Sequence, residues 1–117
     1  GIVRSVVTES TKRSPDAVLV VVTNPLDAMC HVALGASGFP KHRVIGQAGV
    51  LDTARFTHFV AEATGAKVGD VKTLTLGSHG ETMVPVPSVS TVEGKKIVDV
   101  LGAEKVAEAI DTATVIT

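Results

Sequence analysis

Ala17-Val18-Leu19-Val20-Val21-Val22-Thr23-Asn24-Pro25-Leu26-Asp27 is the stretch of sequence that decides the fold. Its first six residues form a continuous apolar run rich in β-branched valine. Such a run predicts a strand buried on both faces, as in a parallel sheet flanked by helices. Helix-start signals follow at once, because Asn24 is a plausible N-cap, Pro25 suits the first helical position and Asp27 lies in the first turn. A strand that leads directly into a helix indicates an α/β fold.

The segments on either side extend this pattern. Upstream, apolar residues at helical spacing over residues 2–7 predict a short amphipathic helix that ends before Ser14-Pro15. Downstream, an apolar stripe predicts a helix that ends at Gly35 and Gly38, and residues 43–47 form a further strand. The stripe consists of Leu26, Met29, Cys30, Ala33 and Leu34. Cys30 is therefore interpreted as a small buried hydrophobe and not as a nucleophile.

An acidic residue lies on the apolar face of the next predicted helix, residues 50–64. At about 100° per residue, Asp52 projects into the stripe that contains Phe56 and Val60, and Arg55 lies beside it. An acid in that place is destabilising unless it is paired. Two interpretations account for it. Either Asp52 and Arg55 form a buried ion pair at i, i+3, or Asp52 orients a base while Arg55 binds a carboxylate.

One of the four histidines lies in a predicted turn where it could act as a general acid or base. The alternating run 71–76 predicts a strand that stops at a glycine, and His79 then lies between Gly77 and Gly80. Histidine titrates nearest neutral pH and is the usual general acid or base. By itself the signal is weak, because a lone histidine in a turn is more often structural than catalytic. Beyond it, the sequence predicts an extended segment at 83–87, a hairpin with a Glu-Gly turn at 91–97 and a polar helix at 103–113.

Composition narrows the classes of function. The chain has 117 residues, 44% of them apolar, and a formal net charge of -1, so no basic surface for nucleic acid is expected. The longest apolar run, 17–22, is too short to span a membrane. A single cysteine cannot form an internal disulfide, which favours a reducing compartment and a cytoplasmic location. No metal site is expected. The chain opens at Gly1 and closes at Thr117 without capping signals, which suggests an internal fragment of a longer protein.

Three motifs, in order and at matching spacing, resemble the lactate/malate dehydrogenase family. They are Val-Thr-Asn-Pro-Leu-Asp at 22–27, Val-Ile-Gly at 44–46 with Leu-Asp-Thr-Ala-Arg-Phe at 51–56, and Gly-Ser-His-Gly-Glu-Thr-Met-Val-Pro at 77–85. The resemblance covers residues 1 to about 106. It implies an α/β fold made of the end of a Rossmann-type parallel sheet, residues 1–24, and the start of an α+β catalytic domain, residues 25–117. Both domains would be incomplete.

The resemblance also implies roles for individual residues. His79 matches the proton acceptor, Asp52 the carboxylate that hydrogen-bonds it, and Arg55 the arginine that holds the substrate carboxylate. Asn24 matches a residue that contacts both substrate and the nicotinamide end of NAD. The cofactor side would be lined by Val22, Thr23 and Asn24. These roles explain the inward-facing Asp52, because a carboxylate fixes the tautomer of a catalytic imidazole and stabilises its charged form.

The implied reaction is the reversible NAD-dependent oxidation of (S)-malate to oxaloacetate, a step of the tricarboxylic acid cycle. The sequence motif around His79 is most similar to that of the lactate-dehydrogenase-like malate dehydrogenases. L-lactate dehydrogenase is the alternative. The loop that would decide between them lies outside residues 1–117, and the choice between NAD and NADP stays open. Family members are dimers or tetramers, so a homo-oligomer is expected.

Several features depart from the family pattern. The sequence holds no Gly-x-Gly-x-x-Gly pyrophosphate loop, and Thr57 stands where the family usually has a second arginine. We therefore expect the 117-residue chain alone to be inactive or nearly so. An alternative of another class is a non-catalytic binding fragment that has inherited an active-site motif.

Overall fold

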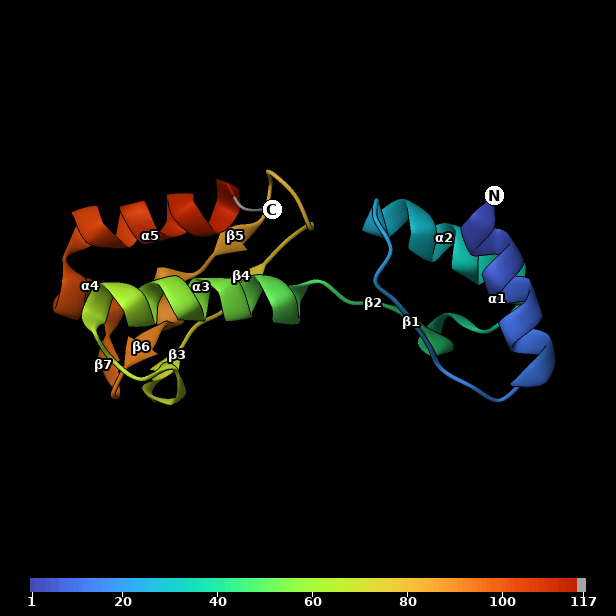
Figure 1. The fold of residues 1–117 in the computed structure, drawn as a ribbon, viewed down its shortest axis with the longest axis horizontal. Helices are drawn as coiled ribbons and strands as arrows, with labels where there is room; N and C mark the ends of the chain where they lie inside the picture. Colours follow the sequence, from blue (N-terminus) through green and yellow to red (C-terminus); the bar gives the residue numbers. More distant parts are fainter. Residues whose placement is uncertain (116–117) are drawn as a thin grey trace. The chain divides into compact units, whose positions relative to one another are not determined.

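The computed structural model describes residues 1–115, and the chain divides into two units, Gly1–Ala48 and Gly49–Thr117. Figure 1 shows helices α1 and α2 with strands β1 and β2 in the first unit, and helices α3 to α5 with the remaining short strands in the second. The domain boundary expected after Asn24 falls inside the first unit, because β1, α2 and β2 pack together there. The last two residues of the expected catalytic segment, 116 and 117, lie outside the described residues.

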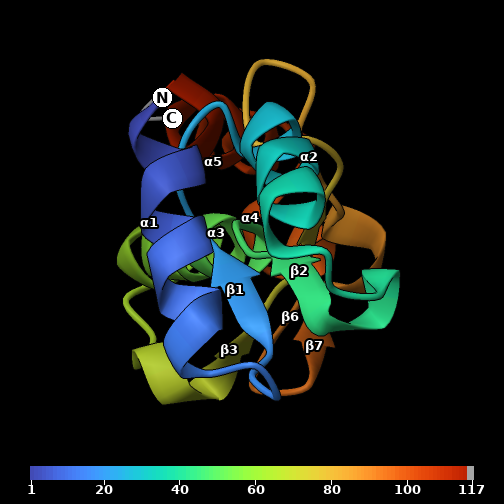
Figure 2. The same ribbon diagram turned by 90° about the vertical axis from the view of Figure 1, so that its right-hand side faces the viewer.

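The first unit is a βαβ arrangement with one more helix. It contains α1 (Ile2–Arg13), β1 (Leu19–Val21), α2 (Leu26–Ser37), a 3-10 turn (Lys41–Arg43) and β2 (Val44–Gly46). β1 and β2 are parallel, with Leu19 opposite Val44 and Val21 opposite Gly46. Figure 2 shows the two strands side by side, with α1 and α2 beside them. The core contains Val7 from α1, Val21 from β1 and Ala33 from α2, so both helices bury their apolar faces against the strands.

The expectation that the 17–22 strand is buried on both faces is wrong for this chain. Val21 is buried, but Val20 is 59% exposed, and Val18 and Val22 are also exposed. The reason is that α1 and α2 pack into one core with Leu19 and Val21, while successive side chains of a strand point to opposite faces. The valines at 18, 20 and 22 therefore form an apolar face that nothing in the described residues of this unit covers.

Helix α2 begins one residue later than the sequence indicates. Its N-cap is Pro25, whose ψ of 124° is extended, and the Pro25 carbonyl accepts the Met29 amide. Asn24 therefore precedes the cap, and no side chain caps this helix. The Asn24–Pro25 peptide is cis. The other end of the helix agrees with expectation in part, because Gly38 is the C-cap in the left-handed conformation at φ 66°, whereas Gly35 lies inside the helix.

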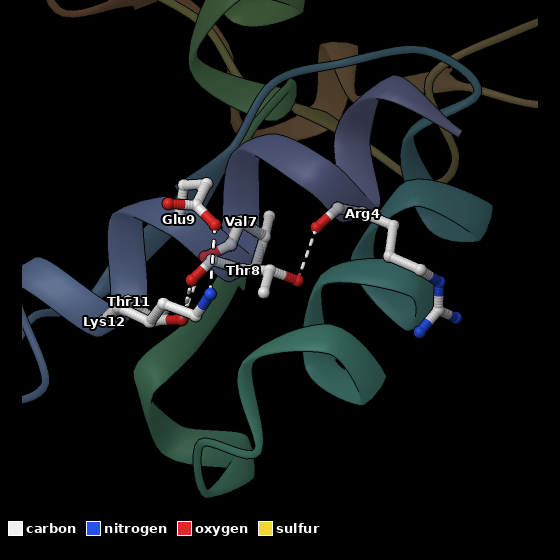
Figure 3. A network of polar contacts seen from close by, with 6 residues as sticks. All are labelled: Arg4, Val7, Thr8, Glu9, Thr11 and Lys12. Carbon is white, nitrogen blue, oxygen red and sulfur yellow. Dashed lines mark hydrogen bonds and ion pairs between the residues drawn. The ribbon is translucent and has the colours of Figure 1, made fainter.

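Helix α1 makes polar contacts between residues three and four apart along the helix, as Figure 3 shows. Lys12 Nζ lies 3.0 Å from Glu9 Oε1, and the hydroxyls of Thr8 and Thr11 donate to the carbonyls of Arg4 and Val7. Lys12 and Glu9 are well exposed, so their ion pair contributes little to stability. The helix is held mainly by its packing through Val7 and Val3.

The second unit is an α+β arrangement. Its helices are α3 (Gly49–Thr64), α4 (Ile97–Leu101) and α5 (Ala103–Val115), with short 3-10 turns at Val68–Asp70 and Pro87–Val89. Its strands are β3 (Val71–Lys72), β4 (Thr75–Leu76), β5 (Val84–Pro85), β6 (Thr91–Val92) and β7 (Lys95–Lys96). They form two antiparallel sheets, β3-β6-β7 and β4-β5. The fully buried side chains of Phe56, Val60 and Ile97 lie in one cluster that joins α3, α4 and α5.

The alternating run 71–76 is two strands, not one. β3 pairs with β6, β4 pairs with β5, and residues 73–74 separate them. The chain changes sheets at Thr73, whose hydroxyl donates to the Thr53 carbonyl on α3. A tertiary contact to the helix has therefore overridden the period-two pattern. The hairpin expected at 91–97 is present as β6 and β7, and Glu93 and Gly94 in its turn are both at positive φ. Strand β7 leads into α4, a helix that the sequence did not predict.

Candidate active site

The second unit brings a buried acid and a partly buried histidine together. Asp52 Oδ2 lies 3.0 Å from His79 Nδ1, and the side chains are 4% and 12% exposed. Asp52 stands in the first turn of α3, where the positive end of the helix dipole favours a negative charge. Since a carboxylate only accepts, Nδ1 carries the proton in this contact and Nε2 is left as the acceptor. This is the arrangement in which an imidazole can take a proton from a substrate.

Arg55 lies on the same helix, three residues from Asp52. Its Nη1 is 4.0 Å from Asp52 Oδ1, at the limit of an ion pair, and neither atom has a hydrogen-bond partner although both are buried. The first of the two interpretations of the sequence was a buried Asp52–Arg55 ion pair. In the structure this pair satisfies the Asp52 carboxylate less well than the hydrogen bond to His79 does. The Arg55 side chain is 30% exposed, so its guanidinium keeps donors that a bound anion can use.

The turn that presents His79 is held by its own backbone and hydroxyls. Gly77 has φ 91°, and a Cβ there would lie 3.0 Å from the Thr82 carbonyl oxygen, so glycine is required for both conformation and space. The Ser78 and Thr82 hydroxyls hydrogen-bond each other across the turn. The Gly80 amide donates to Ser78 and the Met83 amide to Gly80. The histidine therefore extends from a defined turn between β4 and β5.

The other three predicted site residues lie in the first unit. Val22, Thr23 and Asn24 follow β1 directly, and all three are exposed. They stand at the carboxyl end of a parallel strand, which is where open α/β sheets bind their ligands. The Gln47 amide donates to the Val21 carbonyl and continues the pairing of β1 and β2 toward this end. The structure thus groups Asp52, Arg55 and His79 in one unit and leaves Val22, Thr23 and Asn24 exposed in the other.

The hydrogen bonds that four threonines make between α3 and the segment 73–75 were not predicted from the sequence. The Thr53 hydroxyl accepts the Thr75 amide, and Thr57 and Thr73 hydrogen-bond each other at 2.8 Å. The signal that was available is spacing, because Thr53 and Thr57 stand four apart on a helix and Thr73 and Thr75 two apart beside a strand. Among the described residues, no group of three or more His, Cys, Asp or Glu could hold a metal ion. No helix within residues 1–115 is long and apolar enough to cross a membrane.

An imidazole backed by a buried carboxylate, with a guanidinium one helical turn away, defines a site that can exchange a proton with an anionic compound. Comparison with known families agrees with this class. The model of the lactate/malate dehydrogenase NAD binding domain matches residues 1–46, and that of the lactate/malate dehydrogenase alpha/beta C-terminal domain matches residues 49–116. The chain belongs to the lactate/malate dehydrogenase family. The predicted resemblance and the predicted α/β fold class are both confirmed.

Individual relatives support the same assignment. A malate dehydrogenase of Thermomicrobium roseum is 56% identical over 111 residues, which are 95% of this chain and 36% of that protein. The structure of malate dehydrogenase from Salinibacter ruber superposes with a TM-score of 0.92 at 44% identity, over 97% of this chain and 37% of that one. A lactate dehydrogenase from Cryptosporidium parvum, in complex with lactic acid and NAD, gives a TM-score of 0.91 at 33% identity, over 98% and 38%. The chain therefore spans about a third of the length of the relatives it matches.

Proposed function

We propose that this chain carries the proton-transfer part of an NAD-dependent malate dehydrogenase. The observation that carries the proposal is the hydrogen bond of 3.0 Å between Asp52 and His79, on a chain whose similar relatives are named malate dehydrogenases. His79 Nε2 takes the hydroxyl proton of malate and returns it to oxaloacetate in the reverse direction. Asp52 keeps Nδ1 protonated and stabilises the imidazolium that forms. Arg55 binds a substrate carboxylate and orients the carbon that reacts.

The residues at the end of β1 fit a nicotinamide cofactor. NAD, when bound, accepts the hydride that leaves the alcohol carbon. Val22 offers an exposed apolar side chain at the carboxyl edge of the sheet, and Asn24 offers an exposed amide two residues further on. We assign Val22, Thr23 and Asn24 to the cofactor side, with Asn24 also contacting substrate. The exposure of all three residues and their place after a parallel strand support this assignment.

Turnover of two keto acids tests the substrate. The complete product of the gene that encodes this sequence is assayed with NADH and either oxaloacetate or pyruvate. The proposal expects a higher kcat/KM for oxaloacetate. A preference for pyruvate would favour L-lactate dehydrogenase, the second candidate, which the likeness to the Cryptosporidium parvum enzyme supports. A third reading, a non-catalytic binding fragment, predicts that the biological role survives His79→Asn.

The isolated chain provides a separate test. Residues 1–117 contain no Gly-x-Gly-x-x-Gly loop to hold a pyrophosphate, so we expect no micromolar affinity for NAD. Titration calorimetry of the 117-residue chain with NAD checks this, and micromolar binding would overturn it. For the whole protein we propose a dimer or tetramer in the cytoplasm, which light scattering and fractionation examine. A free, partly buried Cys30 is compatible with a reducing compartment.

We also propose that the functional division of the chain follows its two compact units. Residues 1–48 then belong to the cofactor side and residues 49–117 to the substrate side. The family matches, which end at residue 46 and begin at residue 49, support this division.

A further inference from the structure

Strand β4 is anchored to helix α3 by a side chain next to Asp52. The Thr53 hydroxyl accepts a hydrogen bond of 3.1 Å from the Thr75 amide. The two residues are 22 apart in sequence, so this bond is a tertiary contact. Thr53 follows Asp52 in α3, and Thr75 begins the strand that ends at the His79 turn. The bond therefore joins the two elements that carry the acid and the imidazole.

The alternation of a β-strand explains why a side chain is needed at this place. The Val86 amide donates to the Leu74 carbonyl, so the backbone of Leu74 faces β5. The amide of the next residue, Thr75, points to the other side of the strand, toward α3. Thr75 is buried, so its amide needs a partner inside the protein, and Thr53 supplies it.

A second pair of threonines strengthens the same contact between α3 and the segment 73–75. Thr57 and Thr73 hydroxyls lie 2.8 Å apart, and each also lies within reach of the Thr53 carbonyl, at 2.9 and 3.1 Å. Each hydroxyl has one proton, so one of the two donates to the Thr53 carbonyl while the other donates to its neighbour. The Thr53 hydroxyl thus holds Thr75, and the Thr53 carbonyl together with the Thr57 hydroxyl holds Thr73.

We propose that Thr53 is a positioning residue for the reaction. By fixing β4 against α3 it sets the distance between Asp52 and His79, and so it keeps His79 in the tautomer with the proton on Nδ1. The proposal rests on the proposed role of His79 as the base. It adds a residue that touches neither substrate nor cofactor and acts through the geometry of the pair. A threonine that only stabilised the fold would leave the tautomer unchanged in a variant that still folds.

Two spectroscopic readouts on the 117-residue chain test this without any turnover. Long-range ¹H–¹⁵N spectra show which ring nitrogen of His79 is protonated, with the signals assigned by loss in His79→Gln. Amide exchange reports the Thr75–Thr53 bond directly. We expect slow exchange of the Thr75 amide in the unsubstituted chain. In Thr53→Val this exchange becomes about tenfold faster, the ratio that corresponds to losing one net hydrogen bond. His79 loses its preference for Nδ1–H in the same variant.

The controls separate positioning from stability. Thr53→Ser keeps the hydroxyl and should restore both signals. Thr112→Val removes an exposed hydroxyl that donates to the Glu108 carbonyl within α5, and should change neither. The proposal is overturned if Thr53→Val folds and keeps the His79 tautomer. It is also overturned if the Thr75 amide of the unsubstituted chain exchanges as fast as an unstructured one, a measurement that needs no variant. Failure of the proposed function would instead be seen as absent oxaloacetate turnover by the complete gene product.

Discussion

Asp52 Oδ2 and His79 Nδ1 lie 3.0 Å apart, although the two residues are separated by 27 positions in the sequence. The acid is almost fully buried, and its other oxygen has no hydrogen-bond partner in the described residues. A buried carboxylate is costly unless it is hydrogen-bonded and paired. The negative charge of Asp52 is therefore better compensated when the imidazole of His79 is protonated. This coupling is what a group that takes up a proton during a reaction requires.

Asp52→Asn tests that coupling. The substitution keeps the shape of the side chain but removes the charge that stabilises the imidazolium, and it allows the wrong tautomer of His79 to be held. We expect kcat for oxaloacetate reduction to fall by about 10²- to 10⁴-fold, the range for losing a general acid–base contribution. Steady-state kinetics of the complete gene product measure it. Asp111→Asn, an exposed acid on α5, is the matched control. A kcat that Asp52→Asn leaves unchanged would remove Asp52 from the mechanism.

Arg55→Lys tests the anion-binding role. Lysine keeps the charge but cannot form two parallel hydrogen bonds to a carboxylate. We expect kcat/KM for oxaloacetate to fall by about 10- to 100-fold, which corresponds to the loss of one charge-assisted hydrogen bond. Arg13→Lys at the exposed end of α1 should have no effect. If Arg55→Lys behaves like Arg13→Lys, the guanidinium serves the fold and not the substrate.

Patterns within one element were predictable from the sequence. The spacing of apolar residues located α1, α2 and α3, because a helix buries one stripe whatever it packs against. The turn at Glu93 and Gly94 was found for a similar reason, since a two-residue hairpin demands positive φ from its own residues. The inward-facing Asp52 was visible as an anomaly of the stripe, and the family resemblance supplied His79 as its partner.

Features that depend on contacts between elements were not predictable. The break between β3 and β4 follows from bonds of Thr73 and Thr75 to α3, which no local pattern encodes. The exposure of Val20 depends on which face of the sheet the helices cover. The N-cap of α2 is Pro25 and not Asn24 because the ψ angle of the proline is extended. The preference of asparagine for N-cap positions carries no information about the backbone angle of the residue that follows.

The core of the second unit makes a prediction about stability. Ile97 is fully buried in the cluster of Phe56 and Val60, whereas its neighbour Val98 is 42% exposed. Ile97→Val removes one methylene from a packed site and should lower the free energy of unfolding by about 0.5 to 1.5 kcal/mol. Val98→Ala removes more atoms from an exposed site and should cost less. Urea denaturation followed by circular dichroism compares the two, and the reverse order would show that the cluster is not the core.

The thiol of Cys30 should react only at high pH. Burial raises its pKa above the ordinary value, and the negative charge of Asp27 raises it further. The thiolate is the reactive form, so alkylation by iodoacetamide should rise at a higher pH in the folded chain than in urea. Asp27→Asn should move the folded profile part of the way down. Because the folded state holds the proton more tightly, the stability this thiol contributes is full below its unfolded pKa and declines as pH rises through the folded pKa. Coincident folded and unfolded profiles would contradict the burial of this thiol.

The same cysteine limits what can stand at the end of β2. A Cβ on Gly46 would lie 2.7 Å from Cys30 Sγ, closer than two such atoms can approach, and 3.6 Å from Leu26. Gly46→Ala should therefore destabilise the first unit by about 1 to 3 kcal/mol, the usual cost of overpacking. Cys30→Ala removes the atom that clashes, so the double variant should recover most of that loss. A double-mutant cycle by thermal unfolding measures the coupling, and Gly35→Ala, where a Cβ meets nothing within 4 Å, is the control. If the changes in unfolding free energy of Gly46→Ala and Cys30→Ala simply add, glycine is not required at this position because of the cysteine sulfur.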